Sequence, residues 1–120
     1  MLFKRDCDNS YTTGLMAEWR ARWFLRIRGF RILESRYVTG RHTGRAEIDI
    51  IARRGNLIIF VEVKCRRDIH AAFDAITPHQ AARLRRAAQT YIMKNRWMGD
   101  ARFDVIVVLP RKMHWIRGAI

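Results

Sequence analysis

The chain has 120 residues, enough for one compact domain and too few for two ordinary ones, and its 49% hydrophobic residues argue against disorder. Its formal net charge is +13, because 24 lysines and arginines outnumber 11 acids. No apolar run approaches the roughly 20 residues that a membrane-spanning helix needs, so we expect no membrane contact. Two cysteines are too few for a disulfide framework or a zinc site, and with a polar N-terminus they predict a cytoplasmic location.

The excess of positive charge favours a polyanionic partner. A field of this sign concentrates polyanions near the protein, and each neutralised phosphate of a nucleic acid releases counterions. Arginine accounts for 20 of the 24 basic residues (24 less four lysines), and its guanidinium suits bidentate phosphate contact. We therefore expect the partner to be DNA, with RNA as the open alternative. A membrane surface is less favoured because the charge is spread along the chain.

The first half of the chain reads as a tail, a helix and three strands. We expect a flexible tail over residues 1–12 and a helix over 13–28 that ends at Gly29. Gly55 and Asn56 form a hairpin turn between two strands rich in branched residues. The expected strands are 30–38, 46–53 and 57–65, with a basic loop at 39–45.

The second half adds one helix and two strands. Thr77, Pro78 and Gln80 make a capping box with proline at the first helical position, so a helix is expected from 77 to about 96. Strands are expected at 102–109 and 112–117. Because strand, helix and strand follow in order, the third and fourth strands should be parallel. The predicted fold is a single α/β domain over residues 13–120, with a mixed sheet of about five strands flanked by helices.

Two carboxylates interrupt strands that otherwise look buried. Asp49 lies between two isoleucines and Glu62 between two valines. If Gly55 and Asn56 form a two-residue turn, Asp49 faces Glu62 and Glu47 faces Lys64, all on one side of the sheet by period-two alternation. Opposed carboxylates repel each other and are a good site for a divalent cation, Mg²⁺ or Mn²⁺. The alternative is a solvated face at a strand end.

Three further residues are candidates for the same site. Glu18 lies on the helical face of Gly14, Ala21 and Leu25 and could be a ligand, or could form an ion pair with Arg22 four residues on. Lys64 could orient a water molecule or offset charge on a phosphate. Asp104 could be another ligand, but an ion pair with Arg102 is favoured.

Arginines and tryptophans are the candidates for contact with nucleic acid. Any single arginine could equally be solvated surface, and the tryptophans could stack on bases but are favoured as core or half-buried residues. The expected phosphate contacts are Arg41, Arg45, Arg53, Arg54, Arg83, Arg85 and Arg86, and the tryptophans are Trp19, Trp23, Trp97 and Trp115.

The order of these motifs resembles the YraN-like family of small bacterial proteins, which is grouped with the PD-(D/E)xK nuclease superfamily near the Holliday-junction resolvases. The matching motifs are Glu18 in a first helix, Asp49 within AEIDII, FVEVKCR from Phe60, and RFDVIVV, so the resemblance runs from about Gly14 to Ile116. It differs at Ala46, where the family usually has glycine, and at Gln80, where many relatives have lysine.

The resemblance implies a restriction-endonuclease-like core and a set of roles. Asp49, Glu62, the Val63 carbonyl and Glu18 would bind metal, and Lys64 would be the catalytic lysine. The leading hypothesis is a Mg²⁺- or Mn²⁺-dependent endonuclease acting on DNA, with branched DNA among its substrates. The alternatives are a catalytically idle nucleic-acid-binding module, or an accessory protein that docks on a helicase or recombination complex. Resolvases act as dimers, so a homodimer is a further expectation.

Overall fold

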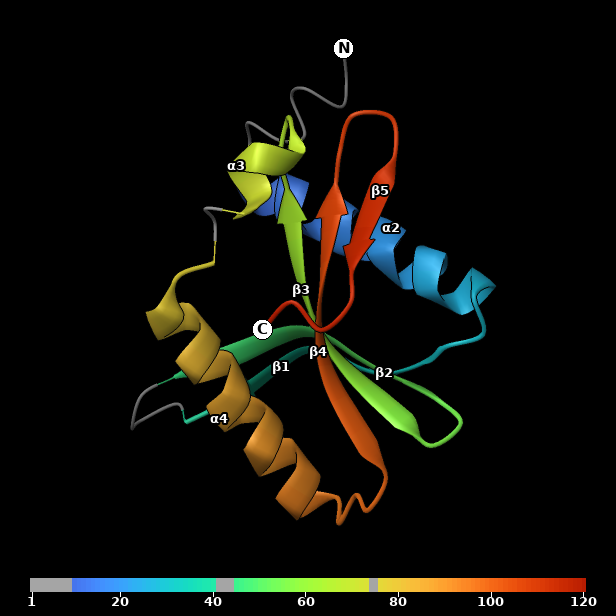
Figure 1. Cartoon of the computed structure of the whole chain (residues 1–120), viewed down its shortest axis with the longest axis vertical. Helices are drawn as coiled ribbons and strands as arrows, with labels where there is room; N and C mark the ends of the chain where they lie inside the picture. Colours follow the sequence, from blue (N-terminus) through green and yellow to red (C-terminus); the bar gives the residue numbers. More distant parts are fainter. Residues whose placement is uncertain (1–9, 41–44, 74–75) are drawn as a thin grey trace.

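The structure is a five-stranded sheet held between two long helices (Figure 1). It is a computed structural model that describes residues 10–40, 45–73 and 76–120. The elements are α2 (Ser10–Ile27), β1 (Arg31–Thr39), β2 (Ala46–Arg54), β3 (Leu57–Cys65), α3 (Ile69–Phe73), α4 (Pro78–Lys94), β4 (Asp100–Val108) and β5 (Met113–Ile116). The predicted α/β class is confirmed, and the arrangement agrees with a restriction-endonuclease-like core.

The predicted elements are recovered with small shifts at their ends. Helix α2 begins at Ser10, three residues before the position expected, and the rest of the expected tail lies outside the described residues. The short helix α3 was not predicted, and the Asp68 carboxylate accepts a hydrogen bond from the Ala71 N–H in its first turn (3.0 Å). Helix α4 begins as predicted, because the Thr77 hydroxyl accepts from the Gln80 N–H and Pro78 is the first helical residue.

Helix α2 ends in a Schellman motif at Gly29. The Phe30 N–H donates to the Leu25 carbonyl and the Gly29 N–H to the Arg26 carbonyl, both at 3.0 Å. Gly29 has φ +89°, a conformation that side-chain-bearing residues rarely adopt. This turn directs the chain from α2 into β1, so that α2 lies across the sheet that follows.

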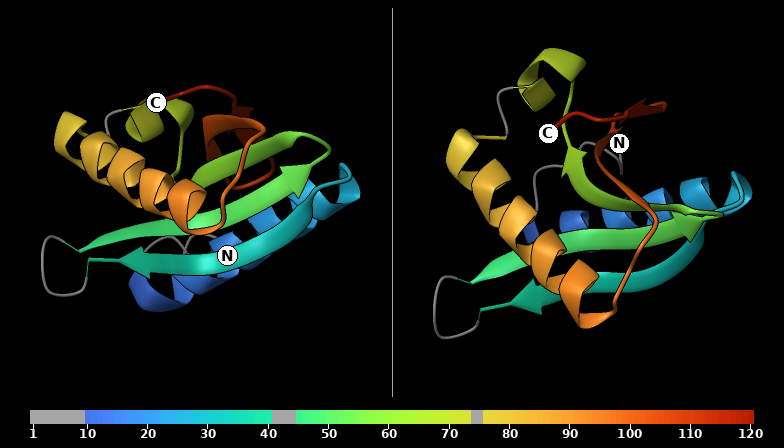
Figure 2. Two further views of the ribbon diagram at one scale, coloured as in Figure 1. Left: turned by 90° about the horizontal axis from the view of Figure 1, so that it is seen from below. Right: turned by 60° about the horizontal axis from the view of Figure 1, so that its bottom comes forward.

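The sheet has the order β1-β2-β3-β4-β5, and its single parallel pair is β3 with β4. The register of the β2–β3 hairpin is the predicted one, from Arg54 opposite Leu57 to Ile50 opposite Val61. The two-residue turn at Gly55 and Asn56 is therefore confirmed. Figure 2 shows the sheet between α2 on one face and α4 on the other.

Each face of the sheet carries its own core. Leu25 of α2 packs with Ile50, Ile59 and Ile106 on one face. On the other face, Leu84 and its neighbours on α4 pack with residues that include Ile48, Ile51 and Phe60. A buried core on both faces explains why the central strands are almost continuously apolar.

The alternation of β2 breaks at Asp49. Ile48 belongs to the core under α4, whereas Ile50 belongs to the core under α2. In a regular strand, residues two positions apart point to the same face, so these two should have shared one core. The pairing of β2 with β3 also stops at Ile50 and Val61, just before Asp49 and Glu62 would face each other. From there β1 and β2 diverge from β3 and β4 (Figure 1). The expectation of one regular face for Glu47, Asp49, Glu62 and Lys64 was therefore wrong, because the strands separate at that point.

Within the described residues, no helix combines the length and apolar character needed to cross a membrane.

Candidate functional site

A pocket of about 390 Å³ opens where β2 and β3 separate. We call it the carboxylate pocket, because four acids from three elements line it: Glu18, Glu47, Asp49 and Glu62. Arg36, Gln80, Arg83 and Leu84 complete its wall. The pocket thus gathers four carboxyl groups and two guanidinium groups in a protein whose net charge is +13. It brings together the three acids that the sequence proposed as metal ligands.

Asp49 and Glu62 are two acids of this pocket whose side chains meet. Burial, followed by the charge of Glu62 and a hydrogen bond with Glu62, raises the pKa of Asp49 to about 8 from an ordinary value of 3.8. The Val63 N–H donates to Asp49 Oδ2 (2.8 Å) and opposes this rise. The two carboxyl groups therefore meet as predicted, through their side chains rather than through a regular strand pair.

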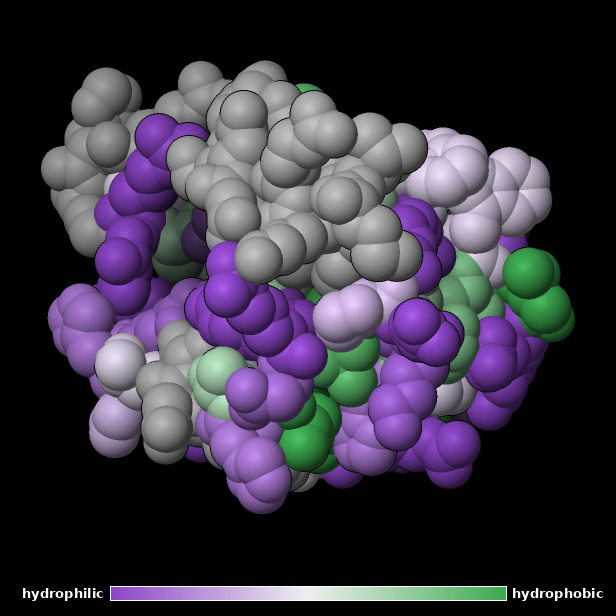
Figure 3. Space-filling model, turned by 90° about the horizontal axis from the view of Figure 1, so that it is seen from above, coloured by the Kyte–Doolittle hydropathy of each residue, from purple (hydrophilic) through white to green (hydrophobic). Residues whose placement is uncertain are grey.

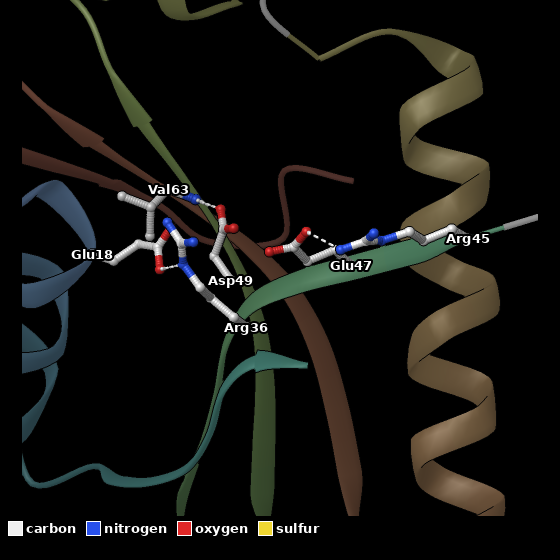
Figure 4. Close-up of polar contacts among 6 residues, drawn as sticks. All are labelled: Glu18, Arg36, Arg45, Glu47, Asp49 and Val63. Carbon is white, nitrogen blue, oxygen red and sulfur yellow. Dashed lines mark hydrogen bonds and ion pairs between the residues drawn. The ribbon is translucent and has the colours of Figure 1, made fainter. Parts of the chain in front are cut away.

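Glu18 enters the pocket from α2 and is bound by an arginine that the sequence did not suggest. Arg36 Nε donates to Glu18 Oε1 (2.9 Å) and Arg36 Nη2 to Oε2 (3.2 Å). Figure 4 shows Glu18, Arg36, Asp49 and Val63 gathered on one side of β2. Burial raises the pKa of Glu18, the hydrogen bond from Arg36 lowers it, and the charge of Asp49 raises it further. The expected ion pair with Arg22 is not the main contact, since Arg36 holds both carboxylate oxygens.

Arg36 reaches this position through an unusual backbone. Its φ is +54°, in the left-handed region that residues other than glycine rarely occupy, although it lies inside β1. Ser35 pairs with Ile50 and Tyr37 with Ile48, so Arg36 and Asp49 occupy the intervening positions of neighbouring strands. The irregularities of β1 and β2 therefore coincide, and together they turn Arg36 towards Glu18.

Glu62 and Lys64 remain close to each other on β3. Lys64 Nζ lies 3.7 Å from Glu62 Oε1, and both side chains are mostly buried, at 14% and 9% exposure. Lys64 does not line the carboxylate pocket itself, so it touches the site through Glu62. The predicted pairing of Lys64 with Glu47 is replaced by this contact within β3.

The far end of the pocket lies against α4. Glu47 forms a long ion pair with Arg45, whose Nη2 is 3.9 Å from Glu47 Oε2, and Figure 4 shows this pair nearer α4 than the Glu18 group. Arg83 of α4 donates a hydrogen bond to the carbonyl of Arg45. Gln80, whose backbone joins the α4 cap, also lines the pocket. Arg45 and Arg83 are thus the predicted phosphate contacts that the structure places beside the carboxylates.

The donor set fits a divalent cation held by two carboxylates. Within the described parts of the chain, no three His, Cys, Asp or Glu side chains stand together as a metal-binding group. Magnesium is seldom bound by protein side chains alone. It is usually bound by one or two carboxylates together with water and substrate phosphates. A cation between Asp49 and Glu62 would offset the repulsion that raises the pKa of Asp49. Glu18 could join them only after it releases Arg36.

Asp104 has a structural role instead. It is fully buried and accepts hydrogen bonds from Arg102 (2.8 Å twice), the Trp115 Nε1–H (2.8 Å) and the Gly118 N–H (3.0 Å). These contacts join β4 to β5 and to the turn that follows it. The favoured reading of Asp104 as the partner of Arg102 is confirmed.

The remaining predicted phosphate contacts are dispersed. Arg53 lies over Trp97 and Arg54 over Phe30, both at the hairpin end of β2, about 13 Å or more along the strand from Asp49. Arg85 and Arg86 are exposed on α4. Arg41 lies outside the described residues. The sequence could not show that Arg45 and Arg83, and not these other arginines, lie beside the carboxylate pocket, because that depends on the positions of the residues in the fold.

The fold and the site together define an α/β protein with an acidic pocket where a mixed sheet divides. The chain belongs to the family described as "Uncharacterised protein family UPF0102", whose model matches residues 17–108, and this confirms the resemblance to the YraN-like proteins. It is 42% identical over 106 residues to the UPF0102 protein bll0669 of Bradyrhizobium diazoefficiens (87% of this chain, 77% of the relative). It is 40% identical over 112 residues to BQ09720 of Bartonella quintana (92% and 88%), and 37% identical over 102 residues to amb4503 of Paramagnetospirillum magneticum (83% and 79%).

Proposed function

We propose that this protein is a divalent-metal-dependent endonuclease that cleaves DNA phosphodiester bonds, with branched DNA as a substrate class. The observation that carries the proposal is the contact between Asp49 and Glu62 in a pocket at the division of the sheet. Two carboxyl groups brought together under burial weaken the fold when both are ionised, unless a cation joins them. A strongly cationic protein that keeps such a pair has a chemical use for it.

The residues in and around the pocket would have separate roles in the reaction. Asp49 and Glu62 would hold Mg²⁺ or Mn²⁺, with the Val63 carbonyl as a further oxygen ligand. When bound, such an ion polarises a phosphate and lowers the pKa of an attacking water. Lys64, held 3.7 Å from Glu62, would offset negative charge that develops on the phosphate. Arg83, which lines the pocket, and Arg45, which pairs with Glu47, would hold the DNA backbone without reading its sequence.

The role of Glu18 in metal binding depends on Arg36. Its two carboxylate oxygens already accept hydrogen bonds from Arg36, so it contributes to metal binding only in a state where Arg36 moves to another anion. The phosphate of a bound substrate is such an anion, because guanidinium binds phosphate as readily as carboxylate. Substrate binding and the completion of the metal site would then be one event.

The second candidate function is a nucleic-acid-binding module without chemistry. The bidentate pair of Glu18 and Arg36 favours it, since a salt bridge that consumes one acid and one base of the pocket can serve stability alone. The third possibility, an accessory protein docked on a helicase or recombination complex, would show salt-insensitive binding to its protein partner. A binding module would instead lose DNA affinity steeply as salt rises.

The test is cleavage of end-labelled linear, flapped and four-way-junction DNA in Mn²⁺ or Mg²⁺ by the wild type and Glu62→Gln. The matched control is Glu34→Gln, which makes the same chemical change at an exposed position of β1. We expect cutting to require metal, to be lost in Glu62→Gln and to persist in Glu34→Gln, while all three proteins bind DNA.

Calorimetric titration with Mn²⁺ in the absence of DNA gives an independent readout. The wild type and Glu34→Gln should bind Mn²⁺, and Glu62→Gln should bind it much more weakly. If no substrate is cut and Mn²⁺ binding is the same in all three proteins, the nuclease proposal fails and the binding module takes its place.

A further inference from the structure

The outer face of α2 exposes two tryptophans. Trp19 and Trp23 are 52% and 49% exposed, although tryptophan side chains are on average highly buried. They are four residues apart, so they lie one above the other on one side of the helix. Leu15 and Ile27 continue the row at the same spacing, and both are also exposed. The row is part of the helix whose opposite face packs on the sheet through Ala21 and Leu25.

The other two tryptophans, Trp97 and Trp115, are less exposed, and each indole N–H donates a hydrogen bond within the protein. Trp97 donates its indole N–H to the Asp100 carbonyl (2.9 Å), and Trp115 donates its own to Asp104 (2.8 Å). Both are half-buried, as the sequence favoured. For Trp19 and Trp23 the structure instead favours the stacking alternative, since a large apolar side chain left in water marks a surface that meets a partner.

The charge around this row indicates which partner fits. Helix α2 carries Arg20, Arg22 and Arg26, and Glu18 is its only acid in sequence. Glu18 is buried and bound to Arg36, so its charge is not offered to a partner. The Arg26 guanidinium lies over the Trp23 ring, 5.2 Å from its centroid. A second copy of this chain would bring another set of arginines against the same surface, whereas a polyanion would be attracted to it.

We infer that Trp19 and Trp23 form a stacking surface for the unpaired bases of a nucleic acid, with the arginines of α2 holding its backbone. Aromatic rings interleaved with cations are how proteins bind single strands without reading their sequence, because every base has a face that can stack. This inference rests on the nucleic-acid part of the proposed function and gives it a substrate class. The preferred substrate has single-stranded nucleotides beside the carboxylate pocket, as flapped DNA does.

The position of the surface connects it with the pocket. Glu18 and Trp19 are consecutive in α2 and point about 100° apart, one into the carboxylate pocket and the other towards solvent. Trp19 therefore follows directly on the residue that α2 contributes to the pocket. Figure 3 views one face of the molecule, on which hydrophobic side chains form small groups among hydrophilic ones.

The test is binding of a labelled oligo(dT) strand and of a blunt-ended duplex, measured by fluorescence anisotropy in a chelator. Two double variants separate stacking from simple hydrophobic contact: Trp19→Leu with Trp23→Leu, and Trp19→Phe with Trp23→Phe. Ile27→Ala is the matched control, since it removes an exposed apolar side chain from the same row. Circular dichroism would verify that each variant is folded.

We expect the leucine variant to lose about tenfold or more in affinity for oligo(dT), because stacking on an aromatic ring is worth roughly this much per base. The phenylalanine variant and Ile27→Ala should stay within about threefold of the wild type, and binding of the blunt-ended duplex should change little in all of them. Unchanged binding of oligo(dT) by the leucine variant overturns the inference. So does a wild-type dimer, seen by sedimentation, that the leucine variant dissociates.

The two proposals can fail separately. If the leucine variant loses oligo(dT) binding while no substrate is cut by the wild type, the stacking surface stands and the nuclease does not. If DNA is cut in a Glu62-dependent way while the leucine variant binds oligo(dT) like the wild type, the nuclease stands and the stacking surface does not.

Discussion

Arg36 binds both carboxylate oxygens of Glu18 across 18 positions of the chain, from the middle of β1 to the buried face of α2. The pair fastens α2 to the edge of the sheet at the point where β2 and β3 separate. It also removes one acid from the set that would surround a metal. Stability and chemistry therefore compete for Glu18.

The first prediction concerns the strength of this pair. Arg36→Ala should lower the free energy of unfolding by roughly 1–3 kcal/mol, less than for a fully buried pair because the Arg36 side chain is 36% exposed. Glu18→Gln should cost less, since glutamine stays neutral in a buried place. Urea unfolding of both single variants and the double variant checks this. Strict additivity of the two effects would show that the contact contributes nothing.

The second prediction concerns pH. The pKa of Asp49 rises from 3.8 to about 8 on folding, so ionising Asp49 opposes the folded state. In metal-free protein its contribution to stability is complete below about pH 4 and is lost as the pH rises through about 8. Glu18 acts in the same sense, because its pKa is also raised.

Asp49→Asn should remove most of this dependence, because the asparagine oxygen can still accept from the Val63 N–H without a charge. We expect the variant to be no more stable than the wild type at pH 5 and more stable at pH 9. Urea midpoints at pH 5, 7 and 9 in a chelator give the comparison. Mn²⁺ should then raise the midpoint of the wild type at pH 9 and leave the variant unchanged; parallel pH profiles of the two proteins would contradict the assignment.

The third prediction separates Asp104 from the pocket. Asp104→Ala leaves the half-buried Trp115 N–H and the Gly118 N–H without their acceptor, so it should cost about 3 kcal/mol. Because Asp104 lies outside the carboxylate pocket, Mn²⁺ affinity of the folded variant should match that of the wild type. Urea unfolding and calorimetry below the melting temperature measure the two quantities. Loss of Mn²⁺ binding in folded Asp104→Ala would return Asp104 to the list of ligands.

The fourth prediction ranks the arginines. Arg83→Gln should weaken binding of duplex DNA and lower the slope of log affinity against log salt by about 1, since one phosphate contact is lost. Arg31→Gln makes the same change at the exposed start of β1, away from the pocket, and should leave the slope nearly unchanged. Titrations at several salt concentrations decide between them. Equal slopes for both variants would mean that the cationic surface acts as a whole.

The meeting of Asp49 and Glu62 could be predicted because it depends on local chemistry. A glycine-asparagine turn sets the register of two adjacent strands, and the register places the two acids at the same level. The sheet order and the helix caps followed from similar short-range signals.

The role of Arg36 could not be predicted in this way. Nothing in the stretch around Arg36 signals a left-handed backbone, because such positions usually carry glycine or asparagine. The partner of Arg36 is on another element, and the nearby Arg22 offered a simpler pairing for Glu18. The exposure of Trp19 and Trp23 was missed for a related reason, since the composition of a helix does not say which of its faces the sheet will cover.

The Val63 amide offers a way to observe the pocket from the backbone. Its hydrogen is held by the Asp49 carboxyl group, at the place where the ladder between β2 and β3 has already ended. An amide held by a side chain exchanges with solvent according to the state of that side chain, whereas amides inside a ladder exchange when the strands open. The nitrogen-15 resonance of Val63 and its deuterium exchange rate should therefore follow the protonation of Asp49 and the arrival of a cation, without any substrate present. One backbone signal thus records the state of a site that lies almost entirely in its side chains.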